Sequence, residues 1–253
     1  MSLPLSSAIA TRLDVLDEAG STNAVLVERA RAGGEPEFSV VVTTNQTAGR
    51  GRLGRTWTAP PGKTIAVSVL LSPPDRLGWL PLLAGLAMTR AVRSLVDGHA
   101  VTLKWPNDVQ VDGLKVSGLL AELVPGAGVV IGAGLNLTME ESELPTPVST
   151  SLTLVGAPAD GLVDRALAAY LGQLKELYDG MLGGSDIRAL VEAECSTIGR
   201  GVRVELPGGD ELFGTATGID AEGRLVVQPL DENGRRAEPR AVAAGDVTHL
   251  RYQ

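Results

Sequence analysis

The sequence has little of the side chains that build disulfides and most protein-held metal sites. Its 253 residues include one cysteine, Cys195, and two histidines, His99 and His249. A single cysteine supplies neither a disulfide framework nor a cysteine-based zinc site. Neither histidine lies near an acidic cluster that resembles a metal site, so the sequence leaves any metal ligands unknown. Cysteine hydrolysis also fits poorly, because Cys195 falls in a predicted helix with no histidine nearby in sequence.

Long apolar runs and an excess of basic residues are absent as well. No run approaches the ~18 apolar residues that a membrane span needs. The first ten residues have neither the basic start nor the apolar stretch of a signal peptide. With 22 basic and 30 acidic residues the net charge is −8, which argues against a protein that binds nucleic-acid phosphates. We expect a cytoplasmic protein without a nucleic-acid or membrane partner.

Lysine is scarce too, since arginine supplies most of the positive charge. The chain has four lysines: Lys63, Lys104, Lys115 and Lys175. Two of them, Lys104 and Lys115, fall within one twelve-residue stretch. Where arginine is the default cation, such a pair of lysines is a hint of function rather than of general solubility.

The hydrophobic pattern predicts a mixture of helices and strands, followed by a β-rich tail. Strands are expected over residues 11–16, 38–44, 64–71, 101–105, 109–111, 115–124 and 128–137, and helices over 24–32, 78–96, 162–178 and 186–195. Short strands over 201–206, 211–219, 223–229 and 240–250 suggest a small β-barrel. We place a domain boundary near residue 198.

A long polar loop over residues 46–61 contains the pattern Gly49-Arg50-Gly51-Arg52-Leu53-Gly54. The pattern follows a strand, but a dinucleotide-binding loop must open a helix there, and the prolines at 60 and 61 prevent it. We therefore expect no regular element in this loop. Glycines allow close approach of the backbone, and Arg50, Arg52 and Arg55 can pair with carboxylate or phosphate. A solvated basic loop is the alternative.

A second group combines Lys104-Trp105-Pro106-Asn107-Asp108 with a hairpin that returns Lys115 and Gly118. This arrangement brings a lysine and a carboxylate to one end of the sheet. An ammonium there can offset charge that develops on a phosphorus or acyl centre. The carboxylate can hold Mg²⁺ or orient an amine. An ordinary hairpin with surface lysines is the alternative.

Two further motifs are uncharged. Ser21-Thr22-Asn23 precede a helix and are either its N-cap or hydrogen-bonding groups for a neutral ligand such as a ureido ring. The alternating glycines of Gly132-Ala133-Gly134 leave one face of a strand bare, where a ligand or another backbone can pack. A bend or bulge in the sheet is the alternative.

Together these motifs resemble the biotin protein ligases in order and spacing. The resemblance extends from about residue 13 to the C-terminus and rests on Ser21-Thr22-Asn23, Gln46 through Arg55 with Trp57, Lys104 through Asp108, Lys115 with Gly118, and Gly134-Leu135-Asn136. It implies an α+β fold with a mixed β-sheet flanked by helices, similar to the class II aminoacyl-tRNA synthetases. The implied domains are residues 1–198, which bind biotin and ATP, and residues 199–253, a small SH3-like β-barrel.

The resemblance also implies an activity and roles for residues. Biotin and ATP give biotinyl-5′-AMP, and a lysine of a biotin carboxyl carrier protein then takes the biotin. Catalysis is assigned to Lys115, Arg52 and Asp108, with Mg²⁺ accompanying ATP. Biotin is expected to contact Ser21, Thr22, Asn23, Gln46, Gly49, Arg50, Arg52, Lys115 and Gly118. ATP is expected to contact Arg52, Arg55, Trp57, Asn107, Lys115 and Asn136.

The sequence departs from the family pattern at two places. Leu53 stands where many relatives have a further arginine or another polar residue, and Ser117 adds a hydroxyl expected near the pocket. Bifunctional members have a helix-turn-helix domain before the Ser-Thr-Asn motif. Here the motif begins at residue 21, so we expect a member of the monofunctional class. It leaves a homodimer open.

Two alternative functions are weighed against this one. A lipoate–protein ligase shares the fold and the acyl-adenylate chemistry and differs mainly in its pocket. A non-catalytic biotin sensor would have no need of Arg52 and Lys115, because pure binding does not require stabilisation of a transition state.

Overall fold

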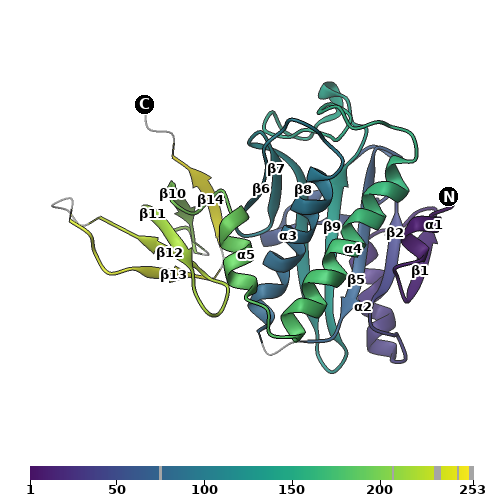
Figure 1. Cartoon of the computed structure of the whole chain (residues 1–253), viewed down its shortest axis with the longest axis horizontal. Coiled ribbons are helices and arrows are strands. Elements are labelled where there is room, and N and C mark those ends of the chain that lie inside the picture. The colour runs from purple at the N-terminus through teal and green to yellow at the C-terminus, as the bar shows by residue number, and fades with distance from the viewer. Residues whose placement is uncertain (74–75, 207, 231–234, 244, 251–253) are drawn as a thin grey trace.

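The computed structural model describes residues 1–73, 76–206, 208–230, 235–243 and 245–250. A large sheet with helices on both faces occupies one side of the molecule, and a smaller sheet lies beside it (Figure 1). The expected α+β class with a mixed sheet is confirmed. Among the described residues, no helix is long and apolar enough to cross a membrane.

The large sheet has seven strands in the order β1-β2-β5-β9-β8-β7-β6. Strands β1 and β2 are parallel and the remaining neighbours are antiparallel. The strands are β1 (Arg12–Leu16), β2 (Ser39–Thr43), β5 (Thr64–Leu71), β6 (Val101–Lys104), β7 (Asp108–Val111), β8 (Leu114–Val124) and β9 (Gly128–Asn136). Every residue of β2, β5 and β9 is buried, which explains why they read as continuous apolar runs.

Helices cover both faces of this sheet (Figure 1). On one face, Leu26 and Ala30 of α2 (Thr22–Ala32) pack with Val41, Leu70 and Val130. The opposite face carries the main core, to which α3 (Leu80–Arg93) and α4 (Leu162–Leu182) contribute. The shorter helices are α1 (Pro4–Ser7) and α5 (Ile187–Glu194), with single turns η2 (Leu77–Trp79) and η3 (Glu141–Glu143).

The loop over residues 46–61 is more ordered than its composition suggests. Strands β3 (Gly49–Arg50) and β4 (Thr56–Trp57) pair as a short hairpin around the turn η1 (Arg52–Gly54). A Cβ on Gly49 would lie 2.4 Å from the carbonyl oxygen of Trp57. The expectation of no regular element here was wrong, because the glycine that suggested irregularity is what permits the two strands to approach.

The C-terminal sheet is antiparallel, with the order β13-β12-β11-β10-β14. Its strands are β10 (Gly201–Glu205), β11 (Glu211–Ile219), β12 (Leu225–Gln228), β13 (Arg240–Val242) and β14 (Asp246–His249). The strand expected over 240–250 is two strands, which lie at opposite edges of the sheet. Among the described residues β13 and β14 do not pair, so the structure has an open sheet rather than the closed barrel that we expected.

Tryptophan side chains join the smaller sheet to the larger one. Trp79 Nε1 donates to the carbonyl oxygen of Ala221 at 2.8 Å, and Trp105 Nε1 donates to that of Gly223 at 3.4 Å. A Cβ on Gly78 would lie 2.0 Å from the carbonyl oxygen of Glu222. The connection between β11 and β12 is therefore closely packed against the start of α3 and the segment after β6. The domain boundary near residue 198 stays a prediction.

Asp164 provides a test of how the N-terminal helix is held. Its carboxylate accepts hydrogen bonds from the backbone of Leu5 and Ser6 and from the Ser6 hydroxyl. Burial raises the pKa of Asp164, but these hydrogen bonds outweigh burial and hold its pKa below the usual range.

We expect Asp164→Asn to lower the free energy of unfolding by about 2 kcal/mol, because hydrogen bonds to a charged acceptor are lost. A depressed folded-state pKa stabilises the protein above the unfolded value of about 3.9, and this contribution disappears as the pH falls through the folded value. Urea titrations of both proteins from pH 3 to 7 measure the difference. A gap that stays constant throughout would contradict the assignment.

Candidate functional site

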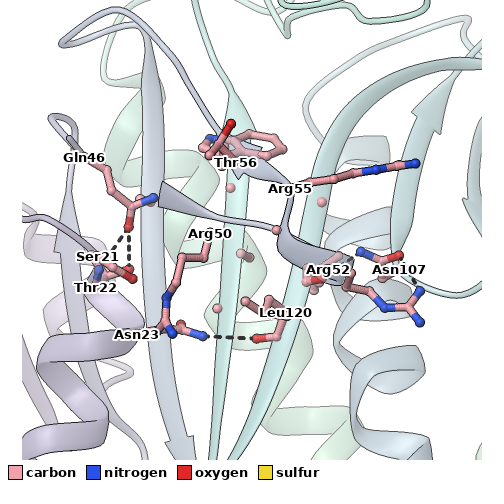
Figure 2. A pocket seen from close by; sticks show the side chains of 18 of the residues that line it. Ser21, Thr22, Asn23, Gln46, Arg50, Arg52, Arg55, Thr56, Asn107 and Leu120 are labelled. Carbon is pink, nitrogen blue, oxygen red and sulfur yellow. Dashed lines mark hydrogen bonds between the residues drawn. The ribbon is translucent and has the colours of Figure 1, made fainter. Parts of the chain in front are cut away.

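A pocket lies against one face of the large sheet, between the N-terminus of α2, the β3–β4 hairpin and strands β7, β8 and β9 (Figure 2). Uncharged side chains line one end, together with Arg50, whose guanidinium is paired with Glu122, and Arg52, Arg55 and Lys115 line the other. Ser21, Thr22 and Gln46 lie on one side in Figure 2, and Arg52, Arg55 and Asn107 lie on the opposite side. The pocket can therefore take a ligand with a neutral polar end and an anionic end.

The uncharged end is built on the start of α2. Ser21 is the N-cap and its hydroxyl accepts from the backbone N–H of Ala24 at 3.4 Å. Gln46 Oε1 accepts from the backbone N–H of Thr22 at 3.0 Å. The Ser68 hydroxyl lies 2.8 Å from Thr22 Oγ1 and 2.6 Å from Asn23 Oδ1. Ser21 is thus the cap of α2 and also lines the pocket, whereas the binding of a neutral ligand by the Ser-Thr-Asn motif stays a prediction.

The cationic end places two positive side chains beside one carboxylate. Lys115 Nζ lies 2.6 Å from Asp108 Oδ1 and 5.9 Å from the centre of the Trp57 ring. Arg52 Nη1 donates to Asn107 Oδ1 at 3.3 Å, and Asn107 Nδ2 donates to the carbonyl oxygen of Leu119 at 2.8 Å. The hairpin predicted from sequence does bring Lys115 to Asp108.

The guanidinium of Arg52 is partly shielded from water and forms no ion pair with a carboxylate among the described residues. Burial lowers the pKa of its guanidinium; Asp108 opposes that shift and Arg55 adds to it. Its hydrogen bond goes to a neutral amide, and among the described residues no carboxylate lies within ion-pair distance of it. A desolvated cation in this state favours an anionic ligand.

The Trp57 indole rests on a part of the sheet that has no side chains. Gly118 of β8 and Gly134 of β9 are paired directly. A Cβ would lie 3.2 Å from the Trp57 ring if placed on Gly118 and 2.4 Å if placed on Gly134. The alternating glycines therefore serve close packing of a side chain, and the Trp57 Nε1 is buried without a hydrogen-bond partner among the described residues.

Two family models match the chain. One, described as "Biotin/lipoate A/B protein ligase family", matches residues 17–136, and one described as "Biotin protein ligase C terminal domain" matches residues 197–250. The chain is 41% identical over 247 residues to the biotin–[acetyl-CoA-carboxylase] ligase of Mycobacterium tuberculosis. The aligned region covers 95% of this chain and 90% of that protein. The chain belongs to the biotin protein ligase family.

Solved structures agree with this membership. The biotin protein ligase of Aquifex aeolicus in complex with biotin and ATP superposes with a TM-score of 0.76 at 27% identity, covering 96% of this chain and 100% of that one. The biotin protein ligase of Leishmania major in complex with biotinyl-5-AMP gives a TM-score of 0.58 at 29% identity, covering 96% and 99%. The fold of this chain is therefore that of the biotin protein ligases over the 96% of its length that these structures cover.

The pocket gathers most of the residues that the resemblance to biotin protein ligases singled out. Those that line it are Ser21, Thr22, Asn23, Gln46, Arg50, Arg52, Arg55, Trp57, Asn107, Asp108, Lys115 and Gly118. Gly49 and Asn136 do not line it. Gly49 belongs to β3 of the hairpin, where a Cβ would come within 2.6 Å of Gln46 Nε2. Asn136 is buried and donates from Nδ2 to the carbonyl oxygen of Thr150 at 2.9 Å, while its Oδ1 has no partner among the described residues.

The two departures from the biotin protein ligase pattern fare differently. The hydroxyl of Ser117 is fully buried and donates to the carbonyl oxygen of Gly134 at 2.7 Å. The hydroxyl expected near the pocket does not line it, because Gly118 lines the pocket and its neighbour Ser117 faces the other side of the sheet. The side chain of Leu53 lies outside the described part of the structure.

Sequence reasoning missed two pocket-related residues, Ser68 and Glu122. Ser68 on β5 and Glu122 on β8 both bond to Asn23, and the side chain of Asn23 fills the space above Gly132. A single carboxylate at the end of the apolar run Leu119-Leu120-Ala121 is the signal that could have identified Glu122. Among the described residues no group of three or more histidine, cysteine or acidic side chains could hold a metal ion.

We expect Gly134→Ala to displace the Trp57 indole, because a methyl group 2.4 Å from the ring must push it out of the pocket. Trp79 and Trp105 are buried, so quenching of fluorescence by acrylamide reports chiefly on Trp57 and should increase.

Gly172→Ala is the matched control for this substitution, since its nearest atom would be Ile9 Cδ1 at 3.9 Å. Unchanged quenching in folded Gly134→Ala would show that the ring does not depend on the bare patch of the sheet.

Proposed function

We propose that this pocket joins biotin to ATP and passes the biotin to a lysine amine, with Lys115 and Arg52 as the cations of the reaction. The chain is an ATP-dependent ligase of the biotin protein ligase family, which activates biotin and transfers it to a carboxylase. The observation that carries the residue assignment is the polarity of the pocket, neutral at Ser21–Gln46 and cationic at Arg52–Lys115. Biotin has the matching polarity, a neutral ureido ring and a carboxylate tail.

The uncharged end recognises the ring in this proposal. A ureido group presents one carbonyl acceptor and two N–H donors, and the hydroxyls and amides of Ser21, Thr22, Asn23 and Gln46 offer both kinds of partner. The backbone beside Arg50 and Gly118 closes around the ring. In this proposal Trp57 supplies an apolar surface between the two ends of the pocket. From the sequence we expected Trp57 to contact ATP, and here it lies between biotin and ATP.

In the first step an oxygen of the biotin carboxylate attacks the α-phosphorus of ATP. The bond from the α-phosphorus to the oxygen that bridges to the β-phosphate breaks, and pyrophosphate leaves with that oxygen. Two anions must approach each other, and Lys115 and Arg52 offset their repulsion. Arg52 suits this role because its half-buried guanidinium bonds the neutral Asn107. Arg55 and Asn107 lie on the same side and are assigned to the nucleotide, as is Asn136 through its buried free oxygen.

In the second step a lysine amine of the carrier protein attacks the acyl carbon, and AMP leaves as the amide forms. Asp108 is the one carboxylate among the described residues that line the pocket. It holds Lys115 Nζ at 2.6 Å and is placed to orient the incoming amine. A biotin carboxyl carrier protein as acceptor, a homodimer and a cytoplasmic location belong to this proposal.

Magnesium enters the proposal only with ATP. Mg²⁺ commonly binds through one or two carboxylates together with substrate phosphates, rather than in a cage of protein ligands. Asp108 and the phosphates fit that pattern, whereas the described residues offer no cluster that would hold the ion by itself. When bound, the ion would supply positive charge at the phosphates.

The lipoate alternative shares this chemistry, and the sensor alternative shares the pocket. The matched C-terminal family and the curated relative both name biotin, which favours biotin over lipoate. The presence of Lys115 and Arg52 together at the anion end favours catalysis over sensing.

The purified chain incubated with ATP and Mg²⁺, and with biotin or lipoate in parallel, should yield biotinyl-AMP and no lipoyl-AMP, as read by mass spectrometry. Lipoyl-AMP alone would overturn the ligand while keeping the mechanism. Neither adenylate, from a protein that still binds biotin, would support the sensor.

We expect Lys115→Ala to slow adenylate formation at least about 100-fold, because a cation that meets the charge of the transition state is lost. The rate of pyrophosphate release at saturating substrates measures this. Lys175→Ala is the control, since that lysine pairs with Asp179 on the exposed face of α4. A folded Lys115→Ala protein with turnover near that of the wild type would rule out the assigned role.

A further inference from the structure

Glu122 lies outside the pocket but bonds to two residues that line it. Its Oε1 accepts from Asn23 Nδ2 at 2.7 Å and from Arg50 Nη2 at 2.9 Å. Asn23 belongs to the first turn of α2, and Arg50 belongs to the β3–β4 hairpin that covers the pocket. Figure 2 shows Arg50 reaching from the hairpin toward Asn23. One carboxylate oxygen of Glu122 therefore connects the β3–β4 hairpin, through Arg50, to the first turn of α2, through Asn23.

The element that carries Glu122 is fixed, whereas the hairpin is not part of the large sheet. Glu122 is on β8 and pairs with Val130 of β9 in the middle layer of the molecule. The hairpin forms a separate two-stranded sheet, anchored at its start by the backbone bond from Ala48 to Gly20 at 2.7 Å. Beyond that anchor, the side chains of Arg50 and Arg52 reach fixed elements, at Glu122 and Asn107.

A ligand in the pocket can compete with the contact between Arg52 and Asn107 but not with the contact between Arg50 and Glu122. Arg52 bonds a neutral amide and faces the anion end, so a phosphate can compete for its guanidinium. Arg50 bonds a carboxylate that does not line the pocket. The contact with Glu122 can therefore persist while the pocket is filled, and it can hold the hairpin during the reaction.

Glu122 also begins a chain of hydrogen bonds that extends along the uncharged end. Asn23 donates to Glu122 and accepts at its Oδ1 from the Ser68 hydroxyl at 2.6 Å. The same hydroxyl lies 2.8 Å from Thr22 Oγ1, and Thr22 in turn contacts Gln46. Fixing the Asn23 amide by its donor side leaves its oxygen oriented toward Ser68. The charge on Glu122 thus sets the orientation of several groups that we assign to the ureido ring.

We propose that Glu122 is a positioning residue that keeps the hairpin closed over the pocket and orients Asn23 for biotin. It acts through Arg50 and Asn23 and does not touch the reacting atoms. The inference rests on the proposed function for its ligand, but the closure itself is a property of the chain. Its loss opens the hairpin, weakens biotin binding and lets biotinyl-AMP escape.

Trypsin offers a measurement of closure that needs no substrate, because the hairpin turn carries Arg52 and Arg55. Cleavage after these residues requires the hairpin to leave its position. In Glu122→Gln we expect cleavage roughly fivefold faster, in line with loss of a partly exposed ion pair. Glu205→Gln is the matched control, since Arg203 Nη2 and Glu205 Oε1 form an ion pair of the same 2.9 Å length in the C-terminal sheet.

Activity assays give the second measurement. Glu122→Gln should raise the KM for biotin several-fold while kcat changes much less. It should also raise the rate at which biotinyl-AMP is released several-fold, which is measured as labelling of bystander lysines. Arg50→Met should show the same changes, and the double variant should be no worse than either single variant. The exchanged pair Glu122→Arg with Arg50→Glu should restore part of the closure.

The outcomes separate this inference from the proposed function. A wild-type chain that forms no biotinyl-AMP would defeat the function, while the trypsin experiment would still test closure. Wild-type cleavage in both Glu122→Gln and Arg50→Met, or additive effects in the double variant, would overturn the role of Glu122. Arg50→Met changes a half-exposed side chain, so it tests closure even where Glu122→Gln does not fold.

Discussion

The contact between the Trp57 indole and the bare patch at Gly118 and Gly134 is the constraint on which the rest of the site depends. The two glycines are paired across β8 and β9, so the patch is a property of the sheet register. Because the ring rests there, the β3–β4 hairpin lies at one height above the sheet, and Lys115 can approach the ring at 5.9 Å.

Charge explains how such a pocket works in an acidic protein. The chain carries a net charge of −8, yet at the anion end three cations, Arg52, Arg55 and Lys115, line the pocket with one carboxylate, Asp108. Asp108 is committed to Lys115 at 2.6 Å, which leaves Arg52 with the amide of Asn107. The unliganded site therefore has an unbalanced positive charge in a partly desolvated position, and an anion that enters relieves this cost. The more distant acidic surface does not cancel this attraction, because solvent and ions screen it.

Local patterns were enough to predict much of this site. The cap residues of α2, the strand that ends before Pro106 and the hairpin that returns Lys115 all have sequence signals that act over a few residues. What failed depended on contacts between distant segments. Pairing of the β3–β4 hairpin requires the close approach of Gly49 to Trp57, and the orientation of Ser117 follows from sheet register. The openness of the C-terminal sheet depends on whether β13 and β14 meet, and the importance of Glu122 depends on Arg50, 72 residues away.

In the proposed mechanism the hairpin needs two contacts of different chemistry, because it must do two things during one cycle. It must stay over a reactive mixed anhydride, and it must let its own arginine serve the phosphates. A single arginine contact could not do both, since a guanidinium that turns to a phosphate has left its protein partner. Assigning Arg50 to Glu122 and Arg52 to Asn107 separates these tasks. Retention of the intermediate then depends on a charge pair outside the pocket, whereas the chemistry depends on a charge inside it. Changes at Glu122 should therefore alter the loss of biotinyl-AMP more than the rate of its formation.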